Sequence, residues 1–292
     1  MTTATLEVTA CEACGGDEFE HGVYGWLTRC RDCGHIFYPQ LPVASAEEVY
    51  TEDYFLQDEY CDYASQGATL GKNFQRYLKR MAKYGARSGR LFEVGCAYGF
   101  FLKEAAAAFD VAGIDVTPEA IEHARSILGL EAHRGDFAEF RTDPTWDAVC
   151  LWDTIEHLFQ PAAYVQKAAS ILRPGGYLFM TTGDIGSFLA RLQGPRWRMI
   201  HPPTHLHYFT TGSMRTLLER SGFEVLGIDK VGASREINNM LVGLSLFSKS
   251  SLIQSAAKTL HRTTGKWWGH AHLYLNLYDI MFVAARKLPE SI

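Results

Sequence analysis

A glycine turn after a short apolar run constrains the fold of this chain more than any other feature. The run Leu91–Val94 leads into the turn Gly95–Gly99, and a helical pattern that we expect over Phe100–Phe109 follows it. The next apolar run ends at Asp115. A strand, a tight turn, a helix and a second strand ending in an acid are typical of the nucleotide-binding half of an open α/β sheet, in which that acid meets ribose hydroxyls.

Strands and helices continue to alternate beyond Asp115. Thr117 and Pro118 suit the N-cap and the first position of the next helix. The patterns predict strands at 91–94, 111–115, 131–134, 146–152, 177–182, 223–229 and 280–285, and helices over 70–84, from 118, and over 161–172, 211–221 and 241–260. Because strands that alternate with helices imply a parallel sheet with right-handed crossovers, we expect an α/β, Rossmann-like fold.

Two CxxC pairs near the N-terminus predict a metal site. Fifteen residues separate the pairs, whose members are Cys11, Cys14, Cys30 and Cys33. Four thiolates on two such turns give the soft tetrahedral ligand set that Zn²⁺ prefers, and four protein ligands make the site structural rather than catalytic. We therefore expect residues 1–40 to form a zinc ribbon, since so small a unit has too little core to fold without a metal. The ribbon could clamp the main domain, contact the substrate or bind a partner.

An aromatic, acidic segment follows Pro39 and Pro42. Its tyrosines offer flat apolar faces and hydroxyls that suit a lid over a pocket; the candidates for substrate contact are Tyr54, Tyr60 and Tyr63. The alternative is helices packed on the ribbon or the core. The chain then divides into the zinc ribbon, an aromatic helical lid and helix over 41–85, and a main domain over 86–292 with insertions at 183–210 and 232–275.

Charge and composition limit the classes of partner. The formal net charge is -5, and 47% of the residues are hydrophobic, which is an ordinary globular mixture. The acidic balance gives no global attraction for nucleic acid, although a local basic patch stays open. Since no apolar run is long enough to span a bilayer and the polar N-terminus lacks a secretory signal, we expect a cytoplasmic protein without a membrane partner. The oligomeric state stays open.

The turn itself indicates which nucleotide derivative fits. A dinucleotide-binding turn has the pattern G-x-G-x-x-G, which brings the backbone and a helix N-terminus close to a pyrophosphate. Counted from Gly95, Ala97 and the bulky Phe100 stand at the second and third glycine positions, and Glu93 adds negative charge. These residues disfavour a phosphate ligand, and with it a nicotinamide-dependent oxidoreductase. They favour S-adenosylmethionine, a nucleoside that carries a sulfonium, an ammonium and a carboxylate.

Five motifs in this order resemble those of class I S-adenosylmethionine-dependent methyltransferases. The resemblance covers roughly residues 70–230 and the last expected strand, and its motifs are Glu93–Gly99, Gly113–Asp115, Gly135–Phe137, Trp152–His157 and Leu172–Gly176. Ala97 departs from the pattern, because the family usually has glycine at that position. The resemblance implies a seven-stranded methyltransferase sheet and S-adenosylmethionine as the cofactor.

The same resemblance assigns residues to the donor site. Around the methionine part of the cofactor it places Glu93, Gly95, Cys96, Ala97, Tyr98, Gly99, Trp152 and Asp153. Asp115 would accept hydrogen bonds from the ribose hydroxyls. Asp136 would bind the adenine amino group, with Val116 and Phe137 beside the ring. The physical basis is that the carboxyl ends of parallel strands meet where ligands bind; the alternative for any one acid is a helix cap or a surface charge.

The ribbon, the aromatic segment and the histidine-rich run 201–209 narrow the resemblance. Together they resemble bacterial zinc-ribbon methyltransferases of sugar or antibiotic biosynthesis, including sugar C-methyltransferases. In those enzymes an acid and a histidine, here Glu156 and His157, are implicated in deprotonation. His157 follows the fourth strand, and its intrinsic pKa suits proton transfer near neutrality. The alternative is that His157 caps the next helix or packs against the cofactor.

The run 196–209 is expected to be a long loop. Its candidates for substrate contact are His201, His205, His207 and Tyr208. A metal is one alternative, although Pro202 and Pro203 forbid a regular helix between the first two histidines, and structural hydrogen bonding is another. His21 and His35, near the cysteines, are expected at the surface or in packing.

The leading interpretation is methyl transfer from S-adenosylmethionine to a small molecule in biosynthesis, for instance a nucleotide-linked sugar. One alternative is an RNA methyltransferase that uses the ribbon as a reader, against which the acidic balance argues. Another is a non-catalytic zinc-ribbon scaffold, against which the intact Glu93, Asp115 and Asp136 argue. Whether carbon, nitrogen or oxygen accepts the methyl group stays open.

Overall fold

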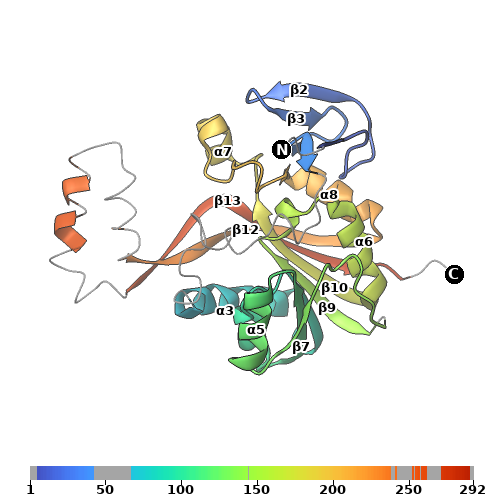
Figure 1. Cartoon of the computed structure of the whole chain (residues 1–292), viewed down its shortest axis with the longest axis vertical. Coiled ribbons are helices and arrows are strands. Elements are labelled where there is room, and N and C mark those ends of the chain that lie inside the picture. The colour runs from blue at the N-terminus through green and yellow to red at the C-terminus, as the bar shows by residue number, and fades with distance from the viewer. Residues whose placement is uncertain are drawn as a thin grey trace.

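A seven-stranded sheet forms the centre of the molecule (Figure 1). The structure, a computed structural model, describes residues 5–42, 67–143, 145–237 and 271–289, with positions 241, 252, 254–256 and 258–261. The strands stand in the order β12-β13-β10-β9-β6-β7-β8. Their bounds are β6 Gly89–Val94, β7 Phe109–Asp115, β8 Glu131–Arg134, β9 Trp146–Trp152, β10 Leu172–Gly183, β12 Phe223–Glu236 and β13 His272–Lys287.

The direction of one strand differs from the expected parallel sheet. Neighbouring strands from β8 to β10 pair in parallel, whereas β13 is antiparallel to both β10 and β12. Two antiparallel neighbours need no connection that crosses over the sheet, so β13 can run back along β12 after the intervening residues 237–271. The expected α/β, Rossmann-like fold with seven strands is confirmed, and the sheet is mixed.

Helices cover both faces of the sheet. On one face α3 Gly67–Lys83, α4 Phe100–Ala105 and α5 Pro118–Ser126 share an apolar core. On the other face α6 Pro161–Ile171 and α8 Thr211–Arg220 pack over a second core. This arrangement leaves the carboxyl ends of the parallel strands as the edge where a ligand can approach.

One helix ends earlier than the sequence pattern predicts, and another begins where it was predicted to begin. The expected helix to Phe109 ends at Ala105, because Phe109 pairs with Gly89 as the first residue of β7. An apolar residue that follows a run of alanines continues a helical pattern, so periodicity cannot separate the two elements. Thr117 stands at the N-cap of α5 as expected, but its side chain makes no capping hydrogen bond.

The N-terminal unit is a small antiparallel sheet that the main domain completes. Its strands β2 Phe19–Val23, β3 Leu27–Cys30 and β4 Ile36–Phe37 are joined by β11 His207–Tyr208, in the order β11-β4-β3-β2. The expected loop 196–209 therefore contributes a strand. β1 Thr5–Glu7 and β5 Gln40–Pro42 form a separate pair. In Figure 1 this unit lies above α8 and beside α7 Phe188–Gln193.

β12 and β13 extend past the other strands as an antiparallel arm (Figure 1). β12 continues to Glu236 and β13 begins at His272. The aromatic segment with Tyr54, Tyr60 and Tyr63, and most of the helix expected over 241–260, lie outside the described residues. Within the described part of the chain, no helix is long and apolar enough to cross a membrane.

Candidate functional site

Four acids lie at the carboxyl edge of the sheet. Glu93 is the penultimate residue of β6 and Asp115 the last of β7, while Asp136 and Asp153 follow β8 and β9. These strands are neighbours and run in parallel, so their carboxyl ends share one edge. Ligands bind at this edge in doubly wound sheets.

The glycine turn leaves no room for side chains at two positions. A Cβ on Gly95 would lie 2.7 Å from Thr154 Oγ1, and one on Gly99 would lie 2.8 Å from Leu130 Cδ1. Ala97 has a φ of 43°, in the left-handed region that favours glycine. Its N–H donates to Asp115 Oδ2 at 2.9 Å, so the acid of β7 holds the turn in place.

Glu93 and Asp115 form a buried acidic pair beside this turn. Their side chains belong to residues that are only 3% and 8% exposed. Burial raises the pKa of Glu93 well above its ordinary value, and the charge of Asp115 adds to the shift. Burial also raises the pKa of Asp115, although N–H groups of Thr117 and Ala97 favour its charged form.

One oxygen of this pair has no partner. Glu93 Oε2 is buried and accepts no hydrogen bond from any described residue. An unsatisfied buried polar group costs about 1–3 kcal/mol. The pair therefore fits a ligand that brings positive charge and hydroxyl groups, as the ammonium and ribose of S-adenosylmethionine would.

The residues expected around the adenine differ in accessibility. Asp136 is half-buried, and its Oδ1 accepts hydrogen bonds from the Ala138 N–H at 2.8 Å and from the Tyr164 hydroxyl. Val116 is also half-buried at the end of β7. Phe137 is buried, and its ring centroid lies 5.8 Å from that of Phe92, so it packs mainly in the core.

Trp152 and Cys96, two of the residues expected around the methionine part of the cofactor, have side chains inside the protein. Trp152 is buried in an aromatic cluster, with ring centroids 4.9 Å from Tyr77 and 5.0 Å from Phe101. Cys96 is buried against Gly113, where any added Cβ would lie 2.7 Å from the Cys96 Cβ. Both side chains thus support the turn by packing.

Tyr98 and Asp153, also expected around the methionine part of the cofactor, lie nearer the surface. Tyr98 is half-buried and stacks on Phe100 with ring centroids 6.3 Å apart. Asp153 is exposed at the end of β9 with a φ of 48°, and its N–H donates to the Thr181 carbonyl at 3.1 Å. Sparsely populated backbone conformations of this kind concentrate at functional sites.

His157 is held by two backbone carbonyls. It ends the 3₁₀ turn η2 Ile155–His157 and is buried. Its Nδ1 lies 2.9 Å from the Thr204 carbonyl oxygen, and the backbone of Asp153 also hydrogen-bonds to the ring. Burial lowers the pKa of His157 to about 4, and the ring is therefore neutral near pH 7.

His205 packs against His157 from the 196–209 segment. The two ring centroids lie 4.6 Å apart in an edge arrangement. His205 Nδ1 donates to the Met199 carbonyl at 2.7 Å, and burial lowers the pKa of His205 to about 2. Ligand-capable atoms of Glu156, His157 and His205 all lie within 4.8 Å of one another, so this trio could share a proton or hold a cation.

The three loop histidines do not share one site. The His201 ring lies 4.6 Å from the His205 ring, whereas His207 Nδ1 lies 3.0 Å from Nε2 of His35 in the N-terminal unit. His35 is fully buried, as expected of a packing residue. The buried Tyr208 hydroxyl donates to the His205 carbonyl at 2.8 Å. Among the described residues, the histidines at 201, 205 and 207 thus form no common set of metal ligands.

The four cysteines of the two CxxC pairs converge. The Sγ–Sγ distances are 3.6 Å between Cys11 and Cys33 and 3.4 Å between Cys14 and Cys30, and all four sulfurs lie within 4.8 Å of one another. Thiolates that each bind Zn²⁺ at about 2.3 Å in a tetrahedron stand about 3.8 Å apart. The donor set and its spacing fit Zn²⁺.

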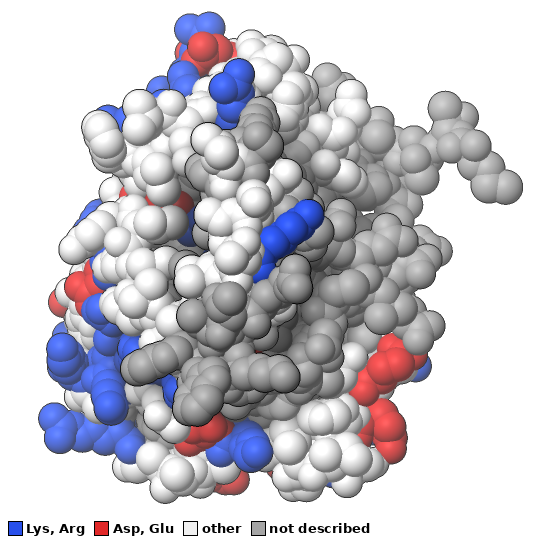
Figure 2. Space-filling model, turned by 90° about the vertical axis from the view of Figure 1, so that its left-hand side faces the viewer, with Lys and Arg blue, Asp and Glu red and all other residues white. Residues whose placement is uncertain are grey.

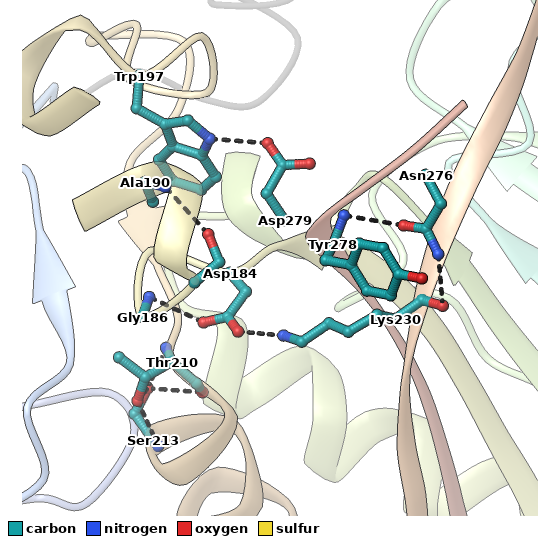
Figure 3. A network of polar contacts seen from close by, with 11 residues as sticks. Asp184, Gly186, Ala190, Trp197, Thr210, Ser213, Lys230, Asn276, Tyr278 and Asp279 are labelled. Carbon is teal, nitrogen blue, oxygen red and sulfur yellow. Dashed lines mark hydrogen bonds and ion pairs between the residues drawn. The ribbon is translucent and has the colours of Figure 1, made fainter. Parts of the chain in front are cut away.

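A polar network that the sequence pattern did not indicate fixes the 196–209 segment (Figure 3). Asp279 in β13 is 1% exposed and accepts hydrogen bonds from Trp197 Nε1 at 2.9 Å and Arg198 Nη2 at 2.8 Å. Asp184, which follows β10, pairs with Lys230, and its N–H donates to the Asp279 carbonyl at 2.8 Å. The available signal was an acid directly before the apolar run 280–285.

Comparisons with known proteins agree with this geometry. Residues 64–228 match the family described as "Methyltransferase domain". The chain is 28% identical over 156 residues to the ubiquinone biosynthesis O-methyltransferase of Bordetella avium, which covers 48% of this chain and 64% of that protein. It is 33% identical over 143 residues to the same-named enzyme of Xylella fastidiosa, with 44% and 55% covered. The match spans less than two thirds of each relative.

The fold also resembles solved structures. One is a S-adenosylmethionine-dependent methyltransferase from Thermotoga maritima, with a TM-score of 0.52 and 18% identity over 80% of this chain and 98% of that one. At this identity the likeness supports the fold alone. The family match, however, covers more than half of the 292 residues. The chain therefore belongs to the methyltransferase domain family, within the class I S-adenosylmethionine-dependent methyltransferases.

Proposed function

We propose that this protein transfers a methyl group from S-adenosylmethionine to a small-molecule acceptor, and that the acceptor is a nucleotide-linked sugar or a related biosynthetic intermediate. The observation that carries the proposal is the buried pair Glu93 and Asp115 at the glycine turn, in which one Glu93 oxygen has no hydrogen-bond partner among the described residues. The pair suits a cationic nucleoside and disfavours a pyrophosphate. The small-molecule O-methyltransferases among the relatives support the class of acceptor.

The residues at the turn would bind and orient the donor. When bound, S-adenosylmethionine supplies an electrophilic methyl group on its sulfonium. Glu93 would meet the ammonium group. Asp115 would accept the ribose hydroxyls through lone pairs that Ala97 and Thr117 do not use. The missing side chains at Gly95 and Gly99 let the turn pack closely against Thr154 and Leu130, which would hold its backbone in place beside the ligand.

His157 would act on the acceptor. Its neutral imidazole would take the proton from a hydroxyl or a carbon acid while the accepting atom bonds to the methyl carbon, and the electron pair of the broken carbon–sulfur bond stays on sulfur. The low pKa keeps the ring in its basic form but makes it a weak base. It therefore suits a proton that becomes acidic only as the new bond forms. Glu156 lies close enough to stabilise the imidazolium that results.

We also propose that the four cysteines bind a structural Zn²⁺. Four thiolates complete a tetrahedral shell and leave no position for a substrate. Glycines with φ of 78° and 72°, Gly15 and Gly34, follow the two pairs and allow the tight turns around the ion. Metal analysis of the purified protein should find one zinc per chain, and fewer after Cys11→Ser.

An RNA substrate is the second candidate, and the charge distribution disfavours it. The formal net charge is -5, and on the described surface of the face shown in Figure 2, lysine and arginine side chains lie in separate groups. Backbone recognition of nucleic acid usually needs a continuous basic surface. Binding to RNA that weakens steeply with salt would favour this candidate over a small acceptor.

Calorimetric titration with S-adenosylhomocysteine tests the donor site. Asp115→Asn should weaken binding about tenfold or more, because it replaces one charged acceptor oxygen with a donor. Asp110→Asn is the matched control, since this acid lies on the same strand and its side chain is 76% exposed. If the wild-type chain does not bind the ligand, the enzyme proposal is wrong.

A panel of nucleotide-linked sugars with methyl-labelled donor tests the acceptor class. His157→Gln should lower kcat about 100-fold while the affinity for S-adenosylhomocysteine stays unchanged, because His157 would serve only the proton transfer. Methylation of other small molecules but of no sugar would contradict the sugar part of the proposal alone.

A further inference from the structure

The N-terminal unit and the 196–209 segment share one sheet. We call the residues from Cys11 to Phe37 the cysteine ribbon. β11 pairs with β4 of this ribbon, with His207 opposite Phe37 and Tyr208 opposite Ile36. The pairing continues beyond the strand, since the Tyr38 N–H donates to the Leu206 carbonyl at 2.8 Å.

A buried hydrogen bond joins His35, which closely follows the second cysteine pair, to this strand. His35 Nε2 lies 3.0 Å from His207 Nδ1, and both residues are at most 3% exposed. The His35 carbonyl also accepts from the Cys30 N–H at 2.8 Å, so its backbone is part of the second cysteine turn. The position of the His35 ring therefore depends on the geometry that the cysteines adopt.

The same strand segment holds His157 from the other side. Thr204 supplies the carbonyl that lies 2.9 Å from His157 Nδ1, and His205 supplies the ring packed against His157. The Leu206 N–H donates to the Glu156 carbonyl at 2.8 Å. Residues 204–207 thus contact the proposed base with one end and the cysteine ribbon with the other.

We propose that the cysteine ribbon positions His157 for methyl transfer, and that His35 is the positioning residue through which it acts. The inference rests on the proposed function, in which His157 is the base. The geometry of the ribbon should then set the rate of methyl transfer but not the affinity for S-adenosylmethionine. The hydrogen bonds that residues 204–207 make outside their own segment go to the region of His157 and to that of the ribbon, and none of them, among the described residues, goes to Glu93 or Asp115.

A second attachment of the ribbon supplies a matched control. At the first cysteine pair, Arg220 Nη1 of α8 donates to the Ala13 carbonyl at 3.3 Å. Loss of this contact weakens docking of the ribbon but leaves residues 204–207 untouched. A purely structural role of the ribbon predicts similar effects at both attachments, whereas a positioning role predicts an effect at His35 alone.

The test compares His35→Leu, His35→Gln and Arg220→Ala in the zinc-loaded protein. His35→Leu should lower kcat about tenfold or more, because small displacements of a catalytic group are costly, with donor Kd changed less than about twofold. His35→Gln keeps hydrogen-bonding groups and should restore most of the rate. Arg220→Ala should keep the wild-type kcat. Zinc content and circular dichroism identify variants that fail to fold.

A readout that needs no acceptor separates this inference from the proposed function. Imidazole ¹⁵N resonances of His157 report the protonation and hydrogen bonding of its two ring nitrogens, and His35→Leu should shift these resonances while Arg220→Ala should not. Unchanged His157 resonances and kcat in His35→Leu would overturn the inference. Equal losses of kcat and donor affinity in that variant would also overturn it, since they indicate a structural role. Absent donor binding in the wild-type chain contradicts the proposed function instead.

Discussion

At the scale of single residues, Ala97 is the non-glycine residue of the turn with a strained, left-handed backbone conformation. Its φ of 43° costs a residue with a Cβ about 1 kcal/mol relative to glycine. Ala97→Gly should therefore raise the free energy of unfolding by up to about 1 kcal/mol, less the entropy that glycine adds to the unfolded chain. Urea unfolding measures the change, and calorimetry checks that donor affinity is kept. A destabilised variant would show that the alanine methyl group makes contacts worth more than the strain.

Residues whose role depends on short spacing could be predicted from the sequence. The four cysteines lie on two local turns, and each acid of the donor edge lies at or just beyond the end of its own strand, so spacing and the family motifs predicted that these side chains lie together. The partners of these residues could not be predicted. His35 and His207 are 172 positions apart, and neither lies in a pattern that indicates a contact. The core packing of Trp152 and Phe137 likewise depends on helices that only the folded chain brings near.

At the scale of elements, strands with a clear apolar period were predicted well. β8 and β9 have the expected bounds, whereas β11 has two residues, which is too short for any period to be recognised. The antiparallel direction of β13 was also missed, because direction depends on the path of the connection and not on the strand's own sequence. The extra length of β12 and β13 shows no regular alternation of buried and exposed residues, so no strand period marks it in the sequence.

The 196–209 segment gives a prediction about acid stability. In the folded chain burial lowers the pKa of His205 to about 2, whereas in the unfolded chain it returns to near 6.5. Below the unfolded value the unfolded state binds more protons, so the stability that His205 contributes at neutral pH is lost as the pH falls. The loss for this residue should reach about 2 kcal/mol near pH 5.

His205→Gln isolates the contribution of His205 to the pH dependence of the unfolding free energy. Glutamine keeps a donor for the Met199 carbonyl but does not titrate. Between about pH 7.5 and about pH 5, the variant should lose about 2 kcal/mol less of its unfolding free energy than the wild type. Glu93, whose pKa is raised, acts in the opposite direction in both proteins and cancels in the comparison. Parallel losses in the two proteins would show that His205 is protonated in the folded state.

At the scale of the whole molecule, the ribbon is part of the main core and not an appendage. Cys11, Ala13 and Cys30 are buried in one cluster with residues of α6 and α8. Metal removal with a chelator should therefore lower the unfolding temperature of the entire protein by several degrees, since one lost attachment of a few kcal/mol is shared by the whole cooperative unit. Calorimetry measures this shift. An unchanged main transition, with early proteolysis confined to residues 11–37, would contradict it.

The strand order also decides when the molecule can assemble during synthesis. β13 lies between β10 and β12, so the sheet has a gap until residue 287 has left the ribosome. The cysteine ribbon is made first, yet its fourth strand, β11, emerges about 170 residues later. During translation the ribbon therefore carries an open strand edge, which is a site for wrong pairing with other chains. The yield of native protein should therefore depend on how soon β11 pairs with β4 after it is made.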